Sequence, residues 1–283
     1  MAVSFEPLSE TTGVSVEGVD LKGDVSASLR DDLYAAFLER AVLVVRNQDL
    51  DPHETLRVAK LFGAPFEQHN TRFQLKDCPE IHYISNKDTF PDGRPYIPGE
   101  GYHTDHSNSA TPPKATLLHA KQLPSKGGDT QFVDMRAAYD ALDEATKARI
   151  DDLKAEHVYQ SSHSERKLVG LTDKRKREVE QSVIHPLARP HTETGRRALY
   201  INPIRIERIL GMENDEALPL LDRLLAHATE ARFQYRHQWR PGDFVMWDNR
   251  RLLHKANGDY DMAETRYLYR LMLRDGPPPS MLA

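Results

Sequence analysis

The sequence predicts a mainly β protein whose core is a double-sheet antiparallel jelly roll (a double-stranded β-helix) with helices at its flanks. Many short apolar segments are bounded by Pro, Gly and Asp, and strand–helix–strand alternations are few. The chain has 283 residues, of which 39% are apolar. That length allows two domains, but no linker divides the chain, so a single domain over residues 1–283 is expected.

Local signals in the first third of the chain predict two helices, one strand and one long loop. Residues 26–40 have amphipathic helical spacing, and the apolar run at 41–45 follows as a buried strand. Asp51 precedes a proline and has an acid three residues later, which indicates a helix start. Residues 84–101 are rich in Pro, Gly and Asp, and a loop of this length is often a functional lid.

The remaining elements follow from alternation and turn residues. The segment at 160–182 is dense in Lys, Arg, Glu and Ser and is expected to be a charged insertion. The other expected elements, in chain order, are strands at 116–123 and 129–135, helical structure at 134–153 broken near Asp143, a strand at 198–202, a helix at 215–230, a hairpin joining 233–239 to 244–247, and a last strand at 266–274.

Composition excludes several classes of protein and partner. The net charge is −5 and the pI about 6.2, which disfavours nucleic acids and anionic membranes as partners. Cys78 is the single cysteine, so no internal disulfide can form. The N-terminus lacks a basic and apolar leader, and the run at 41–45 is too short to span a bilayer. A cytoplasmic protein is expected, and its oligomeric state, including a homo-oligomer, stays open.

Three His-x-Asp/Glu triplets occur in the chain, and chance alone would give about two. They begin at His103, His163 and His191. His163 lies in the charged insertion and His191 in an expected polar turn. The triplet His103-Thr104-Asp105 closes the long loop and leads into a strand pair, where sites tend to rest on a rigid frame. It is therefore the preferred candidate.

A second histidine supports that choice. His254 follows the expected strand at 244–247. Two histidines and one carboxylate form a facial triad that suits non-heme Fe(II) and leaves three coordination positions open. A chelating 2-oxo acid and O2 could fill those positions. A zinc hydrolase on the same three residues is the alternative, since zinc also takes three protein ligands and a water. A cupin-like binding module without turnover is a third reading.

The last expected strand carries two arginines on one face. Arg266 and Arg270 alternate with apolar residues and would stand ~13 Å apart. Such arginines are costly on an apolar face unless they meet anions, and arginine suits bidentate carboxylate recognition. A structural alternative is that each pairs with a nearby acid, such as Asp259 or Glu264.

Taken in order, these motifs resemble one known family. They are His103-Thr104-Asp105, Thr111-Pro112-Pro113, the segments GGDTQFVDMRAAYDAL and YRHQWRPGDFVMWDNR, His254, and the pair Arg266 and Arg270. The chain resembles the taurine dioxygenase and 2,4-dichlorophenoxyacetate dioxygenase family of Fe(II)/2-oxoglutarate-dependent oxygenases. The resemblance covers most of the chain and is weakest at 64–100 and 160–190.

The resemblance implies a role for each matching residue. His103, Asp105 and His254 would bind iron, Thr130 and Arg266 would bind 2-oxoglutarate, and Arg270 would bind the acidic group of the substrate. Three further positions are weaker: Tyr102 as a pocket wall, Asn70 as a substrate contact, and Trp247 as either a site wall or ordinary core. Relatives often have an aromatic residue where this chain has Asn108, which suggests a more polar pocket. His106 is not expected to bind metal, because neighbours in an extended strand face opposite ways.

The implied activity is hydroxylation of a small anionic organic substrate, such as an aryloxyalkanoate or a sulfonate, with 2-oxoglutarate and O2 consumed and succinate and CO2 released. Hydroxylation beside an ether oxygen or a sulfonate would also cleave the substrate. The zinc hydrolase ranks lower, because it gives no reason for the Arg266 and Arg270 face or for Thr130.

Overall fold

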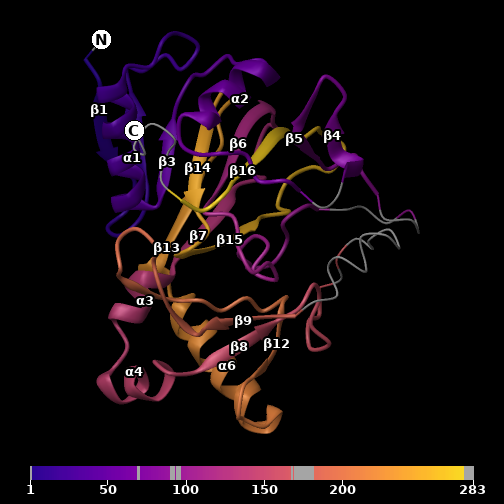
Figure 1. The fold of residues 1–283 in the computed structure, drawn as a ribbon. Helices are drawn as coiled ribbons and strands as arrows, with labels where there is room; N and C mark the ends of the chain where they lie inside the picture. Colours follow the sequence, from indigo (N-terminus) through magenta and orange to yellow (C-terminus); the bar gives the residue numbers. More distant parts are fainter. Residues whose placement is uncertain are drawn as a thin grey trace.

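A computed structural model describes residues 2–68, 71–89, 93, 97–166, 168 and 182–276. Strands dominate the described part of the chain, and the helices are few (Figure 1). The expected lid at 84–101 begins later than predicted, because the preceding strand runs to Ser85, and part of it lies outside the described residues. Most of the charged insertion at 160–182 also lies outside them.

One sheet of eight strands forms the frame of the molecule. Its central strand β14 pairs antiparallel with β3 on one side and β6 on the other. In spatial order the strands are β1 (Ser4–Pro7), β2 (Val14–Glu17), β3 (Val42–Val45), β14 (Phe244–Asp248), β6 (Ala115–Gln122), β16 (Tyr267–Leu273), β5 (Cys78–Ser85) and β4 (Gln74–Leu75).

A three-stranded sheet packs against one face of this frame. It consists of β13 (Gln234–His237), β7 (Thr130–Asp134) and β15 (Leu252–Ala256), paired in that order. Strand β3 shows why both faces are filled. Val42 and Val44 belong to the apolar cluster that also contains Phe132 of β7, whereas Leu43 and Val45 belong to a different cluster on the opposite face. All four residues are buried, as expected for a strand covered on both sides.

Two helices cover the outer face of the eight-stranded sheet. Helix α1 (Ala27–Arg40) begins at its cap Ser26, whose hydroxyl accepts from the amide of Leu29, and ends where Ala41 turns left-handed at φ 60°. Helix α2 (Pro52–Lys60) has the predicted capping box between Asp51 and Glu54. Both helices pack on the apolar cluster that contains Leu43 and Val45.

The remaining elements form a smaller body at one end (Figure 1). Their buried residues make a third apolar cluster. The predicted break in the helical structure near Asp143 is confirmed, because Asp143 caps the second of two short helices. The elements are α3 (Met135–Asp140), α4 (Glu144–Ile150), β8 (Lys154–His157), β9 (Val183–Pro186), β10 (Ala188–Pro190), β11 (Arg197–Leu199), β12 (Ile206–Ile209) and α6 (Asn214–Ala228). The described chain contains no helix that is both long and apolar enough to span a membrane.

The expected hairpin between 233–239 and 244–247 is wrong. Strand β13 pairs with β7 in the small sheet, whereas β14 pairs with β3 and β6 in the large one. The turn at Gly242 therefore carries the chain from one sheet to the other. Both strands alternate as predicted, but alternation fixes only which face is buried and not which strand is the neighbour.

Candidate metal centre

Three side chains predicted as metal ligands converge in the structure. One ligand atom from each of His103, Asp105 and His254 lies within 4.8 Å of the other two. The Nε2 atom of His103 is 3.9 Å from Oδ1 of Asp105, and the Nε2 atom of His254 is 3.8 Å from Oδ2. These distances leave room for one ion among the three groups. Among the described residues, only this group of three could hold a metal ion.

Backbone pairing sets the positions of the two histidines. His254 lies on β15, and an isolated antiparallel bridge joins it to His103. The amide of His103 donates to the carbonyl of His254 at 3.0 Å, and the reverse bond measures 2.8 Å. Thr116 of β6 donates its hydroxyl to Oδ2 of Asp105 at 2.6 Å. Two strands from different sheets therefore orient three ligands that are distant in the sequence.

The protonation states suit a divalent cation. Burial lowers the pKa of His254 to about 4 and the pKa of His103 well below its usual value, so both rings are neutral at pH 7. Nδ1 of His103 lies 2.8 Å from the carbonyl of Gly101 and donates to it, which leaves Nε2 as the ligand atom. Burial opposes ionisation of Asp105, but the guanidinium of Arg270 outweighs it and holds the pKa of Asp105 well below its usual value. Two neutral imidazoles and one carboxylate fit Fe(II).

A cavity of about 200 Å³ opens on the three ligands. It is lined by residues from both sheets and from the smaller body. Thr130, Arg266 and Arg270 line it, as does Trp247, whose ring centroid is 4.8 Å from that of His254. Trp247 also belongs to the apolar cluster between the sheets, so it serves as both site wall and core.

Arg266 enters the cavity without a carboxylate partner. Its side chain is buried, and its Nε donates to the carbonyl of Gly128 at 2.9 Å. Within the described ranges no carboxylate oxygen lies within 4.0 Å of its guanidinium, so the expected alternative of pairing with Asp259 or Glu264 does not hold. Burial lowers the pKa of Arg266 to about 10, so the group stays charged at pH 7.

Thr130 lines the same cavity with its hydroxyl proton available. Its Oγ1 accepts from the indole N–H of Trp239 at 3.0 Å. The described residues offer no acceptor for the Thr130 proton, although the side chain is buried. Thr130 and Arg266 together therefore present two donors to the cavity, which is what a carboxylate needs.

Arg270 contacts the ligand set directly. Its Nη2 is 2.8 Å from Oδ1 of Asp105, and its Nη1 donates to Oε1 of Gln68 at 3.2 Å. Neither of the acids considered from the sequence is its partner, since Asp259 pairs with Arg236. The two arginines predicted to share a face both line the cavity.

Three expectations near the ligands need correction or stay open. Tyr102 is not among the residues that line the cavity. Its side chain is used in other contacts: its hydroxyl donates to Gln234, and the ammonium group of Lys255 lies over its ring. His106 follows Asp105 in a turn with φ 47° and not in an extended strand; it lines the cavity but is not one of the three converging ligands. Asn70 lies outside the described residues.

Asn108 does not line the cavity, contrary to the expectation that it makes the pocket more polar. The polarity of the pocket comes from residues that the sequence did not single out. These are Gln68, His82, Tyr159, Arg166 and Arg205. His82 lies within β5 and the other four in loops, and none of them belongs to a motif, so only knowledge of the folded chain could have found them.

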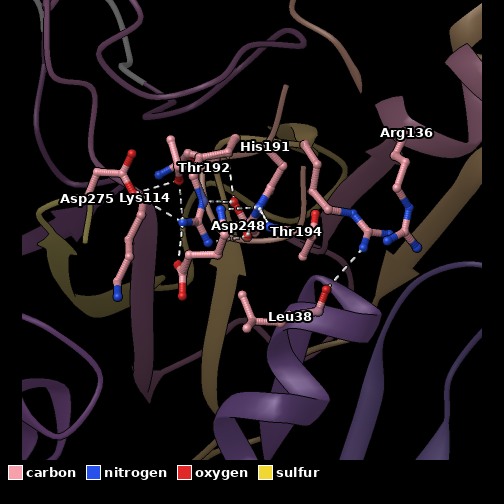
Figure 2. Close-up of polar contacts among 12 residues, drawn as sticks. Leu38, Lys114, Arg136, His191, Thr192, Thr194, Asp248 and Asp275 are labelled. Carbon is pink, nitrogen blue, oxygen red and sulfur yellow. Dashed lines mark hydrogen bonds and ion pairs between the residues drawn. The ribbon is translucent and has the colours of Figure 1, made fainter. Parts of the chain in front are cut away.

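The triplet that begins at His191 has a structural role. Its imidazole Nε2 lies 2.9 Å from Oδ2 of Asp248, and its Nδ1 accepts from the amides of Glu193 and Thr194. Figure 2 shows His191, Thr192, Asp248 and Asp275 drawn together by hydrogen bonds and ion pairs. This buried network lies apart from the cavity lining, so His191 is not a metal ligand there.

Comparisons with known proteins agree with this geometry. A family model described as "Taurine catabolism dioxygenase TauD, TfdA family" matches residues 4–272. The chain is 34% identical to the alpha-ketoglutarate-dependent 2,4-dichlorophenoxyacetate dioxygenase of Cupriavidus pinatubonensis, over 97% of this chain and 99% of that protein. It is 35% identical to the (S)-phenoxypropionate/alpha-ketoglutarate-dioxygenase of Sphingobium herbicidovorans, over 98% and 96% of the two chains.

Solved structures show the same fold. The crystal structure of AAD-2 in complex with Mn(II) and N-oxalylglycine matches 98% of this chain and all of its own chain, with a TM-score of 0.82 and 31% identity. A taurine dioxygenase from Burkholderia xenovorans matches with the same TM-score and identity over 97% of this chain and 90% of its own.

Proposed function

We propose that this chain, which belongs to the TauD/TfdA family of alpha-ketoglutarate-dependent dioxygenases, hydroxylates a small anionic organic acid. The reaction consumes the substrate, 2-oxoglutarate and O2 and yields the hydroxylated substrate, succinate and CO2. The observation that carries the proposal is the convergence of His103, Asp105 and His254 at a cavity that also contains Arg266, a cation with no carboxylate partner among the described residues.

The protein would hold and orient the reactants. His103, Asp105 and His254 would bind Fe(II), which supplies the oxidising chemistry together with 2-oxoglutarate and O2. The hydrogen bond from Thr116 keeps Oδ2 of Asp105 in place, and the contact of His103 with Gly101 keeps Nε2 directed at the ion. Trp247 covers one side of His254 and excludes water there.

Thr130 and Arg266 would bind the carboxylate of 2-oxoglutarate that is remote from the metal. Arg266 supplies the charge, and Thr130 supplies a neutral donor. Gly128 permits this arrangement, because a Cβ there would lie only 3.2 Å from Cδ of Arg266 and its φ of 72° favours glycine. The pair thereby fixes the direction from which the co-substrate reaches the metal.

Arg270 would bind the acidic group of the substrate beside the metal. The relatives described above act, by their names, on dichlorophenoxyacetate and phenoxypropionate, and a further relative from Saccharomyces cerevisiae, 29% identical, is a sulfonate dioxygenase. All three substrate classes carry an anionic group. Leu118 and Ile84 line the cavity and would contact the hydrocarbon part. Asn70 stays a predicted substrate contact.

The two facing sheets are proposed to be a double-stranded β-helix within one domain. The apolar cluster between them contains side chains from β3, β6, β7 and β14, which is the packing that such a core requires. Three further expectations stay predictions: a lid at residues 84–101, a cytoplasmic location and the formation of a homo-oligomer.

The zinc hydrolase is not favoured by any observation. It would leave Arg266 and Thr130 without a ligand, and the relatives described above are dioxygenases.

An assay of co-substrate turnover tests the proposal. The purified protein is given Fe(II), ascorbate and 2-oxoglutarate, and O2 uptake and succinate are followed. We expect metal-dependent succinate formation, reduced at least 100-fold in Asp105→Ala and His254→Ala because each removes one of three ligands. His163→Ala, which alters a triplet outside the site, is the matched control and should keep full turnover. Unchanged turnover in Asp105→Ala, or zinc-stimulated hydrolysis without O2 uptake, contradicts the proposal.

A further inference from the structure

Besides Arg266 and Arg270, the arginine Arg205 also faces the cavity, from the wall that the smaller body provides. Arg205 lies between β11 and β12, whereas Arg270 lies on β16 of the large sheet, and both line the cavity. The Nη1 atom of Arg205 donates to the carbonyl of Tyr159 at 2.6 Å, and its guanidinium lies 5.3 Å from the centroid of the Tyr159 ring. These contacts hold the cation at a fixed place.

Arg205 has no counter-ion in the described part of the chain. No carboxylate oxygen there lies within 4.0 Å of it, and its bond to Tyr159 uses only one of its nitrogens. Burial lowers the pKa of Arg205 to about 10, so it remains charged at pH 7. Arg205 is partly buried, and a cation withdrawn from water without an anionic partner is costly, which indicates that a ligand supplies the partner.

With Fe(II), 2-oxoglutarate and a monoanionic substrate bound, the negative charges would be balanced by groups other than Arg205. The two charges of Fe(II) would be balanced by Asp105 and by one carboxylate of 2-oxoglutarate, and the other carboxylate by Arg266. The substrate's acidic group would meet Arg270. Asp88 also lines the cavity, but its carboxylate lies near the hydroxyl of Tyr83 and forms no ion pair with Arg205 in the described structure.

We propose that Arg205 binds a second anionic group of the substrate, so that the substrate class is a dianionic organic acid held by Arg270 at one end and by Arg205 at the other. This inference rests on the proposed function and narrows its substrate class. Ile204 and Tyr159 line the same wall as Arg205 and would contact the hydrocarbon part of the molecule. The carbon to be hydroxylated would then lie between the two anionic groups.

Binding of two matched probes tests the inference. Protein loaded with Mn(II) and N-oxalylglycine is titrated calorimetrically with phenoxyacetate, a monoanion, and with 4-carboxyphenoxyacetate, the corresponding dianion. We expect the dianion to bind about 10-fold more tightly or better, because it gains a charge-assisted hydrogen bond. Arg205→Gln should abolish this preference, and Arg205→Lys should restore part of it.

Arg208→Gln is the matched control. Arg208 lies three residues further on, pairs with Glu156 and does not line the cavity, so its removal should leave the preference unchanged. Equal binding of the two probes by the unmodified protein, no detectable binding of the dianion, or an unchanged preference in Arg205→Gln overturns the inference. Failure of the proposed function is a different result, namely no succinate formation from 2-oxoglutarate with Fe(II).

Discussion

Histidines of this chain are distinguished by what their two ring nitrogens contact. In His103 the Nδ1 atom meets a backbone carbonyl, and Nε2 faces two other ligand groups. In His191 the Nε2 atom meets Asp248, and Nδ1 accepts from two backbone amides, so no ligand atom is left. Both histidines belong to a His-x-Asp/Glu triplet. The triplet alone therefore does not predict a metal ligand. The fold decides whether the second ring nitrogen is free to bind a metal or is already used by a protein group.

Replacement of Arg266 should weaken 2-oxoglutarate binding. We expect Arg266→Gln to raise the KM for 2-oxoglutarate about 30-fold or more, because a buried carboxylate would lose its only charged partner. Steady-state succinate formation at varied 2-oxoglutarate measures this. Arg232→Gln, which alters an exposed ion pair with Glu230, should leave the KM unchanged. An unaltered KM in Arg266→Gln would show that the co-substrate binds elsewhere.

His119 should make stability depend on pH. Burial lowers its pKa to about 4 in the folded protein, below the usual value of 6.5. Between these values the unfolded chain binds more protons, so the free energy of unfolding decreases as pH falls from 6.5 toward 4, by about 1 kcal/mol per pH unit. His119→Gln should remove this part of the dependence, whereas His53→Gln, at an exposed helix position, should retain it. Urea unfolding at pH 7 and pH 5 measures the difference, and equal slopes in all three proteins would contradict it.

At the scale of elements, features encoded by neighbouring residues could be predicted, and features that need a distant partner could not. The capping box of α2 depends on Asp51 and Glu54, which are three residues apart, and it formed as expected. The strand at the C-terminal end, β16, also formed. The expected hairpin failed because the partners of β13 and β14 lie far away in the sequence.

The same limit applies to the site. The convergence of His103, Asp105 and His254 could be predicted, because each residue lies in or next to a recognisable motif. The cavity walls could be predicted only in part. Thr130, Arg266 and Arg270 line the cavity as expected. Gln68 and Arg205 come from segments without a pattern and meet only after folding, so the sequence did not single them out. Tyr102 shows that proximity in the sequence is not enough. It precedes His103 directly, yet its ring does not line the cavity.

The cap of α1 should contribute measurably to stability. Ser26→Ala removes the hydroxyl that accepts from the amide of Leu29, and we expect it to lower the free energy of unfolding by about 1 kcal/mol. Ser28→Ala, two residues further on and inside the exposed first turn, replaces a helix-neutral residue with a strong helix former and should cost nothing. Urea unfolding of both variants tests the cap, which has no role if they behave alike.

At the scale of the whole molecule, one buried ion network joins parts that are distant in the sequence. Arg250 pairs with Asp248 at 2.8 Å, with Glu193 at 2.5 Å and with Asp275 at 3.1 Å. Glu193 in turn accepts from the hydroxyl of Tyr34 in α1. The network therefore ties the β10–β11 hairpin, the end of β14, the first helix and the segment after β16 to one another.

Breaking this network should destabilise the entire fold. Arg250→Gln leaves Asp248 buried without its cation, and we expect a loss of about 3–5 kcal/mol in the free energy of unfolding. Arg208→Gln breaks an exposed ion pair with Glu156 and should cost at most about 1 kcal/mol. Denaturant unfolding followed by circular dichroism compares them, and similar losses in both would show that the network adds little.

The backbone bridge between His103 and His254 has a consequence for how the protein acquires its metal ion. Because amide and carbonyl groups hold the two imidazoles in register, the coordination geometry is already in place when synthesis and folding are complete. Maturation can then proceed in two independent stages, with iron delivered after the polypeptide has adopted its final shape.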